Sequence, residues 1–283
     1  MRAVIVSLVL LLTVGIAACG APTTAAPTTA PAAAPAAKVT APVAASARDL
    51  NVFAAASLTE AFTEIGKAFE AANPGVKVTF NFAGSQQLVQ QLGQGAPADV
   101  FASAATRNMD DAMKAGSVAD GAAQTFARNR LVAIVPQANP TGIKALADLG
   151  KPGARVVLAA KEVPVGQYAL DFLDKASKDA GYGTDYKDKV IKNVQSYEQN
   201  VRAVLSKVTL GEADAGIVYN TDVTQEAAPK VTRIEIPDAL NTVATYPIAA
   251  VKGTRNPAAD RFVAFVLSDA GQTILKKYGF ITG

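Results

Sequence analysis

The sequence contains no histidine, and Cys19 is the only cysteine among its 283 residues. Without histidine the chain can form neither a Ser-His-Asp or Cys-His catalytic centre nor a His-ligated metal site. A single cysteine also excludes a disulfide within the chain. The phosphate-binding patterns GxxxxGKS/T and GxGxxG are absent as well. Catalysis would have to rely on carboxylates alone, and no pair of them suggests a pocket. We therefore expect a binding protein without a cofactor rather than an enzyme.

The charge balance is nearly even. The 27 lysines and arginines exceed the 24 aspartates and glutamates by only three, for a formal net charge of +3. No long basic run or RNA-type aromatic motif accompanies them, so we expect no nucleic-acid partner. Beyond the N-terminal segment, no apolar run is long enough to cross a membrane.

The N-terminus resembles that of a bacterial lipoprotein. A short basic start precedes an apolar run over residues 4–16, which has the length of a signal-peptide core. The run ends in Ile16-Ala17-Ala18-Cys19, which is similar to a lipobox. Residues 1–18 are therefore expected to be a signal peptide, cleaved before a lipidated Cys19. A plain secretory signal with an incidental cysteine is the alternative.

Residues 19–47 are rich in alanine, proline and threonine. Such a segment cannot bury a core and favours extended polyproline II. We expect a linker that holds a folded body off the membrane. The expected location is extracytoplasmic, lipid-anchored to the bacterial cell membrane on its periplasmic side or at the cell surface.

From residue 48 onward, apolar strands alternate with amphipathic helices. Strands are predicted at 50–54, 76–82, 98–102, 131–135, 156–160, 215–219 and 245–251. Helices are predicted to start at Ser57 and Val201 and to cover 107–115 and 166–176. Ser57 and Glu60 have capping-box spacing, which predicts Ser57 as an N-cap. Residues 197–200 are predicted to form a polar turn. This alternation predicts an α/β fold with parallel sheets, whose ligands bind beyond the carboxyl ends of strands.

Several predicted strand-to-helix junctions are small and uncharged. They carry hydroxyls and free N–H groups but no lysine, arginine or carboxylate; they are Ala56-Ser57, Ala83-Gly84-Ser85, Val163-Pro164-Val165-Gly166, Asn200-Val201 and the strand end at Tyr219. Each alone has an ordinary structural explanation. Ser57 and Ser85 could simply cap helices, Val201 could be a core residue, and Tyr219 could pack between layers.

Taken in order, these junctions resemble a known family, the molybdate-binding proteins of bacterial ABC importers, over residues 49–283. The segments that carry the resemblance are Val52-Phe53-Ala54-Ala55-Ala56-Ser57-Leu58, Gly95-Ala96-Pro97-Ala98-Asp99-Val100-Phe101, Val163-Pro164-Val165-Gly166-Gln167-Tyr168-Ala169, Asn200-Val201-Arg202-Ala203, Gly216-Ile217-Val218-Tyr219 and Lys277-Tyr278-Gly279-Phe280. The resemblance implies the type II periplasmic binding protein fold. Its two α/β lobes would each contain a mainly parallel sheet flanked by helices, with the ligand in the interlobe cleft. Lobe 1 would comprise 48–130 plus 246–283, and lobe 2 would comprise 131–245.

The resemblance also implies a ligand set. Ser57 and Ser85 would supply hydroxyls and N–H groups, Val165 and Val201 backbone N–H groups, and Tyr219 its phenol. Two features depart from the usual family pattern: Ser85 is the only hydroxyl of its loop, and valine replaces a frequent alanine at 165. The implied ligand is molybdate or tungstate, with no bare metal cation. The implied partners are an ABC permease and its ATPase, and the protein is expected to be a monomer.

The chemistry of these residue types agrees with a dianion. Neutral donors pair with a fully deprotonated tetrahedral anion, whereas a protonated anion also needs an acceptor for its proton. Sulfate has the same charge and shape as molybdate but is smaller. It is therefore an alternative ligand, which only the size of the pocket could exclude. A ferric ion is a further candidate ligand, but it would need clustered phenolates. A cell-surface enzyme or adhesin that reuses the fold is the alternative to a binding protein.

Overall fold

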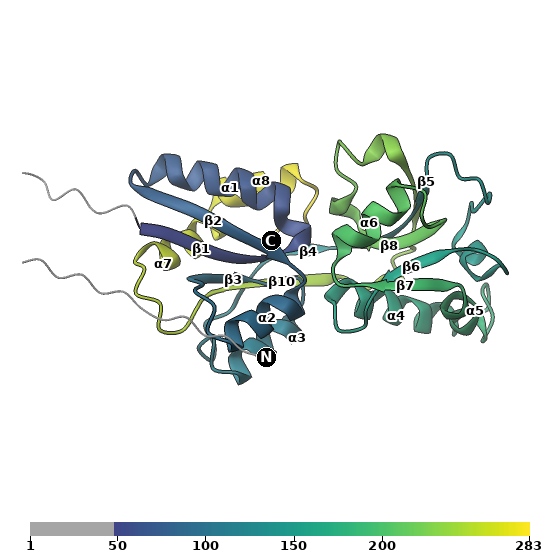
Figure 1. Cartoon of the computed structure of the whole chain (residues 1–283), viewed down its shortest axis with the longest axis horizontal. Helices are drawn as coiled ribbons and strands as arrows, with labels where there is room; N and C mark the ends of the chain where they lie inside the picture. Colours follow the sequence, from purple (N-terminus) through teal and green to yellow (C-terminus); the bar gives the residue numbers. More distant parts are fainter. Residues whose placement is uncertain (1–47) are drawn as a thin grey trace, which may run out of the picture. The chain divides into compact units, whose positions relative to one another are not determined.

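The computed structural model describes residues 48–283. The predicted signal peptide (1–18), Cys19 and the linker (19–47) lie outside the described residues. The described chain forms two five-stranded sheets, each covered by helices (Figure 1). We call the part built on the first sheet lobe 1 and the part built on the second sheet lobe 2. No helix within 48–283 is long and apolar enough to span a membrane.

The sheet of lobe 1 has the strand order β2-β1-β3-β10-β4. Its strands are β1 (Arg48–Ala55), β2 (Val76–Ala83), β3 (Val100–Ala102), β4 (Gln124–Asn129) and β10 (Ala244–Ala250). Its helices are η1 (Ala56–Leu58), α1 (Thr59–Ala72), α2 (Ser85–Gly93), α3 (Thr106–Lys114), α7 (Ala258–Leu267) and α8 (Asp269–Lys277). Alternate residues of β1 face opposite layers, as the pleat requires. Val52 belongs to the large apolar cluster that includes residues of α1 and α7, while Phe53 belongs to a separate cluster with residues of α2 and α3.

The sheet of lobe 2 has the strand order β7-β6-β8-β5-β9. Its strands are β5 (Leu131–Pro136), β6 (Val156–Ala159), β7 (Val194–Glu198), β8 (Ala215–Tyr219) and β9 (Val231–Glu235). Its helices are η2 (Leu146–Gly150), α4 (Pro164–Ala176), α5 (Tyr186–Lys192), α6 (Val201–Thr209), η3 (Asn220–Asp222) and η4 (Ala228–Lys230). Helix α6 covers one face of this sheet, and α4 and α5 cover the other (Figure 1).

The prediction of an α/β protein with two lobes is confirmed, but the sheets are mixed rather than mainly parallel. In each sheet, two strand pairings are parallel and two are antiparallel. The antiparallel pairings involve β10 in lobe 1 and β5 in lobe 2. The chain enters both strands directly from the other lobe. Parallel neighbours require a crossover connection, usually a helix, and these two strands have none, so they can run antiparallel.

Only Arg130 separates the end of β4 from the start of β5, so the chain passes from one sheet to the other there. It returns between the end of β9 and Ala244, the first residue of β10. The prediction of a polar turn at 197–200 is wrong in part, because Tyr197 belongs to the edge strand β7.

Candidate functional site

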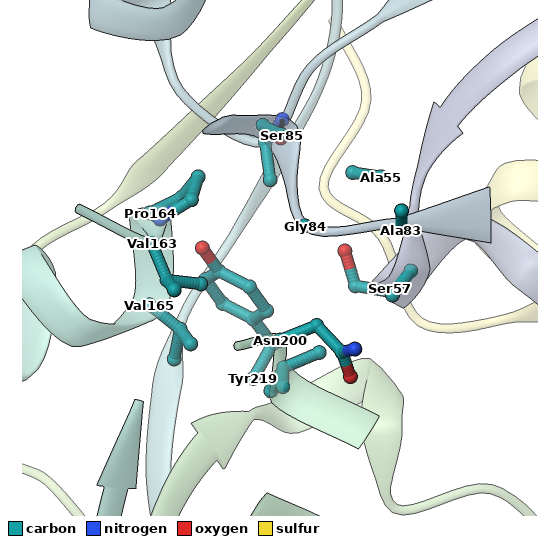
Figure 2. Close-up of a pocket in the computed structure, with 13 residues that line it drawn as sticks. Ala55, Ser57, Ala83, Gly84, Ser85, Val163, Pro164, Val165, Asn200 and Tyr219 are labelled. Atoms are coloured by element: carbon teal, nitrogen blue, oxygen red, sulfur yellow. Dashed lines mark hydrogen bonds between the residues drawn. The ribbon is translucent and has the colours of Figure 1, made fainter. Parts of the chain in front are cut away.

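All five residues that the sequence motifs suggest line one pocket between the two lobes. Lobe 1 contributes Ala55, Ala56, Ser57, Ala83, Gly84, Ser85 and Ala104, and lobe 2 contributes Val163, Pro164, Val165, Asn200, Val201 and Tyr219. The cavity that a water-sized molecule can occupy is only about 10 Å³. Drug-sized ligands need roughly 300–1,000 Å³, so this pocket suits a small ion. Figure 2 shows the loops of the two lobes facing each other across it.

Ser57 reaches the pocket from the end of β1, but the predicted N-cap role is wrong. Ser57 lies inside η1, and the N-cap position of α1 is Leu58, which makes no side-chain cap. Instead, the Oγ of Ser57 lies 2.9 Å from the hydroxyl of Tyr246. The chain makes a 3-10 turn before the α-helix, which turns the serine toward the interior. Capping-box spacing cannot reveal a partner 189 residues away.

Ser85 is the first residue of α2, directly after β2 and Gly84. Its Oγ accepts a hydrogen bond from the Ala104 N–H at 3.0 Å. Gly84 lies against the other lobe so closely that a Cβ there would be 2.4 Å from the carbonyl oxygen of Gln199. That carbonyl also accepts a hydrogen bond from Gln86 Nε2 at 2.9 Å. The loop that carries Ser85 is thus held against lobe 2.

Val165 and Val201 offer backbone N–H groups, because each lies in the first turn of a helix. The first N–H groups of a helix have no intrahelical acceptor. Val165 follows Pro164, the first residue of α4, and Val201 is the first residue of α6. Asn200 caps α6 by accepting the Ala203 N–H, which leaves the Val201 N–H without an acceptor in the described chain. The Val165 N–H is equally without one among residues 48–283.

Tyr219 is the last residue of β8 and is 1% exposed. Its hydroxyl is buried and has no hydrogen-bond partner within 48–283. Figure 2 shows the hydroxyls of Tyr219 and Ser57 directed into the space between the lobes. Burial raises the pKa of the Tyr219 phenol well above its ordinary value of 10, so the hydroxyl keeps its proton. An unpartnered buried hydroxyl costs about 1–3 kcal/mol, which a ligand that accepts the bond would recover.

No charged side chain lines the pocket. Helices α2, α4 and α6 all begin at its wall, and helix N-termini favour a bound anion. The hydroxyls and N–H groups together form a set of neutral donors. Such a set can bind an anion but contains no general base or activated nucleophile. No cluster of acidic or cysteine side chains that could hold a metal ion occurs in the described part of the chain.

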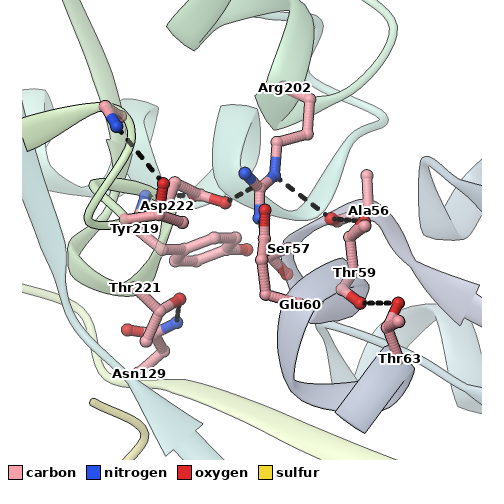
Figure 3. Close-up of polar contacts among 12 residues, drawn as sticks. Ala56, Ser57, Thr59, Glu60, Thr63, Asn129, Arg202, Tyr219, Thr221 and Asp222 are labelled. Atoms are coloured by element: carbon pink, nitrogen blue, oxygen red, sulfur yellow. Dashed lines mark hydrogen bonds and ion pairs between the residues drawn. The ribbon is translucent and has the colours of Figure 1, made fainter. Parts of the chain in front are cut away.

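A charged cluster that bridges the two lobes lies behind this wall (Figure 3). Arg202 of lobe 2 contacts the Glu60 carboxylate of lobe 1, and its Nε lies 3.3 Å from the Ala56 carbonyl oxygen. The same Nε lies 3.3 Å from Oδ1 of Asp222, whose Oδ2 accepts the Tyr219 N–H at 2.9 Å. Burial raises the pKa of Asp222 to about 6, although Arg202 opposes the shift. This cluster ties the loop of Tyr219 to the loop of Ser57.

Sequence reasoning did not assign roles to Tyr246, Arg202 and Asp222. Arg202 belongs to one of the quoted motifs, but its side chain carried no prediction. Tyr246 was noted only as the position of the predicted second lobe boundary, without a role in the site. Their contacts join segments far apart in the chain, so no local pattern could have indicated them.

The two lobes, the small pocket between them and its uncharged donors define a solute-binding protein. The chain matches the model of the bacterial extracellular solute-binding protein family over residues 50–281. It belongs to that family, whose members act outside the cytoplasm.

Comparisons with individual proteins agree. The chain is 42% identical to the molybdate-binding protein ModA of Mycobacterium tuberculosis over 271 residues, which cover 95% of this chain and 94% of that protein. The substrate-binding domain of a putative molybdenum ABC transporter from Clostridium difficile is 30% identical, with a TM-score of 0.60, and the match covers 83% of this chain and 99% of that domain. The Azotobacter vinelandii periplasmic molybdate-binding protein shares the fold, with a TM-score of 0.71, 21% identity and coverage of 83% and 99%. The resemblance drawn from the motifs is confirmed.

Proposed function

We propose that the protein binds molybdate, and also tungstate, outside the cytoplasm and delivers it to an ABC permease driven by an ATPase. The observation that carries this proposal is the Tyr219 hydroxyl, buried in a pocket of neutral donors and without a partner in the described chain. An acceptor-rich ligand explains why such a group is tolerated. The relatives named for molybdate support the choice of anion.

The proposed ligand set is Ser57, Ser85, Val165, Val201 and Tyr219. Each serine would donate from its hydroxyl and its backbone N–H, and the other three residues would donate once each. A hydrogen bond to a charged group contributes about 1.5–3 kcal/mol, so this set can offset the dehydration of a dianion. Each serine Oγ already contacts a donor or hydroxyl of the protein, at 2.9 Å for Ser57 and 3.0 Å for Ser85.

The proposal includes the motion and the location of the protein. The ligand would close the lobes by bridging them, as a hinge. The lobe boundary at 130/131, a return to lobe 1 before Ala244, the lipid anchor at Cys19 and the monomeric state belong to the same proposal. The protein would perform no chemistry on the anion and would bind neither a cofactor nor nucleic acid.

Isothermal titration of the purified body, residues 48–283, tests the proposal. Molybdate and tungstate should bind tightly, whereas sulfate should bind at least about 100-fold more weakly, because donors spaced for a larger tetrahedron sit too far from its oxygens. Phosphate should give no heat at the same concentration. Absence of binding by both molybdate and tungstate would refute the proposal. Tight sulfate binding would reassign the protein to the sulfate class.

A further inference from the structure

Tyr246 lies behind the pocket and does not line it. It belongs to β10, is fully buried, and packs edge-on against Tyr219 with ring centroids 5.8 Å apart. Its hydroxyl lies 2.9 Å from the Oγ of Ser57 and 3.4 Å from Nδ2 of Asn129. Tyr246 can therefore influence a bound anion only through Ser57 or through packing.

Either oxygen could donate in the bond between Tyr246 and Ser57, and the neighbouring hydrogen bonds favour Tyr246 as the donor. The Oδ1 of Asn129 accepts the Arg130 N–H at 2.9 Å, so the other end of this amide is its NH₂ group. That group donates to the hydroxyl oxygens of Thr221 at 2.7 Å and of Tyr246 (Figure 3 shows the bond to Thr221). Because the Tyr246 oxygen accepts from Asn129, its own proton is free to go to Ser57.

Ser57 then receives a hydrogen bond from Tyr246 and keeps its own proton for the pocket. Ser85 is arranged in the same way, because its Oγ accepts the Ala104 N–H at 3.0 Å. Burial also raises the pKa of the Tyr246 phenol, so it keeps its proton across the physiological range. Both pocket serines are thereby set as donors, by partners that come from other segments of lobe 1.

We propose that Tyr246 is a positioning residue that determines specificity: with Asn129, it fixes the Ser57 hydroxyl as a donor and so excludes anions that carry a proton. This inference rests on the proposed oxyanion-binding function. A protonated tetrahedral dianion, such as monohydrogen arsenate, must donate its own proton to an acceptor. Each serine oxygen already receives one hydrogen bond, which directs the serine's own proton toward the pocket and makes the oxygen a poorer acceptor for the proton of such an anion.

The test compares Tyr246→Phe with wild type by isothermal titration of residues 48–283 with molybdate and with arsenate at mildly alkaline pH. The matched control is Tyr186→Phe, which removes another buried hydroxyl, one that donates to the Leu146 carbonyl away from the pocket. We expect Tyr246→Phe to lower the affinity for molybdate about 5- to 30-fold, as the loss of an orienting hydrogen bond implies. Its affinity for arsenate should fall much less or rise, because the freed Ser57 oxygen can accept a proton. The control should leave the ratio of the two affinities unchanged.

A second variant protects the test against a packing defect at position 246. Asn129→Leu leaves Tyr246 in place but removes the donor to its oxygen, so Ser57 can donate to Tyr246 and turn a lone pair toward the ligand. It should lower the molybdate-to-arsenate ratio in the same direction. Equal loss for both anions in both variants would show a merely structural role and overturn the inference, as would unchanged molybdate binding. If wild type itself binds neither molybdate nor tungstate, the proposed function fails instead.

Discussion

Replacing Tyr219 by phenylalanine separates its binding role from its packing role. The ring stays in place, and only the hydroxyl that lacks a partner among residues 48–283 is removed. If the phenol donates to a bound dianion, the variant loses one hydrogen bond to a charged group. That loss is about 1.5–3 kcal/mol, or about 10- to 150-fold in affinity. Without ligand, the variant should be at least as stable as wild type, because a buried unpartnered hydroxyl costs about 1–3 kcal/mol.

Thermal unfolding with and without molybdate measures both effects. A ligand at about 1,000 times its Kd stabilises a protein by about 4.1 kcal/mol. At the same concentration, a variant that binds about 100-fold more weakly gains only about 1.4 kcal/mol. The molybdate-induced shift should therefore shrink to about a third, while the unliganded melting temperature stays the same or rises.

The control is Tyr168→Phe, in a tyrosine whose ring packs edge-on against Tyr219 at 6.5 Å but does not line the pocket. It should leave the molybdate shift unchanged. Wild-type affinity in Tyr219→Phe would refute the reasoning and reduce the phenol to a packing group. A marked loss of unliganded stability would also contradict it, because the hydroxyl would then have a structural partner.

Three further predictions concern the bridging cluster and the N-terminus. Arg202→Gln removes the ion pair with Glu60 across the lobes, so stopped-flow release of molybdate should be about 3- to 10-fold faster; an unchanged rate would contradict a role in closure. Asp222 has a pKa of about 6 against an ordinary 3.8, so the folded protein binds its proton more tightly and loses stability as pH rises from about 4 to 6. Asp222→Asn lacks this loss, so its stability relative to wild type should grow by roughly 3 kcal/mol over that range and then stay constant. Urea unfolding at a series of pH values measures this difference, and a difference that does not change with pH would argue against the prediction. Cys19→Ser should move the full-length protein out of the membrane fraction of the producing bacterium, and retention there would exclude the lipid anchor.

The strands that the sequence predicted correctly are those with a strong local signal. Central strands such as β5 are apolar on both faces, and β2 alternates apolar and polar residues over its length. The strands that were missed, β4, β7 and β9, are all edge strands, and the other edge strand, β2, was found because its alternation is clear. An edge strand packs on fewer neighbours and carries more polar residues, so its pattern resembles that of a loop. The antiparallel direction of β5 and β10 could not be predicted from the local sequence either, because it depends on how the chain passes between the lobes.

The sequence predicted which loops form the candidate site, but not the groups that orient their side chains. Ordered junction motifs placed Ser57, Ser85 and Tyr219 at strand ends, and the structure brings them to one pocket. The groups that orient them were not predictable. The partner of Ser57 is Tyr246, and that of Ser85 is the backbone of Ala104, which has no side-chain signature at all. Hydrogen-bond direction is a tertiary property, so it needs coordinates.

The division of the pocket between two lobes has a consequence for unloading. Lobe 1 carries Ser57 and Ser85, while lobe 2 carries Val165, Val201 and Tyr219, and no cation on either side would retain the anion alone. A permease that pulls the halves apart would leave its cargo with an incomplete shell, which water can replace. Under the proposed function, discharge then needs mechanical work only, with no change in the protonation of the anion or in the oxidation state of its metal.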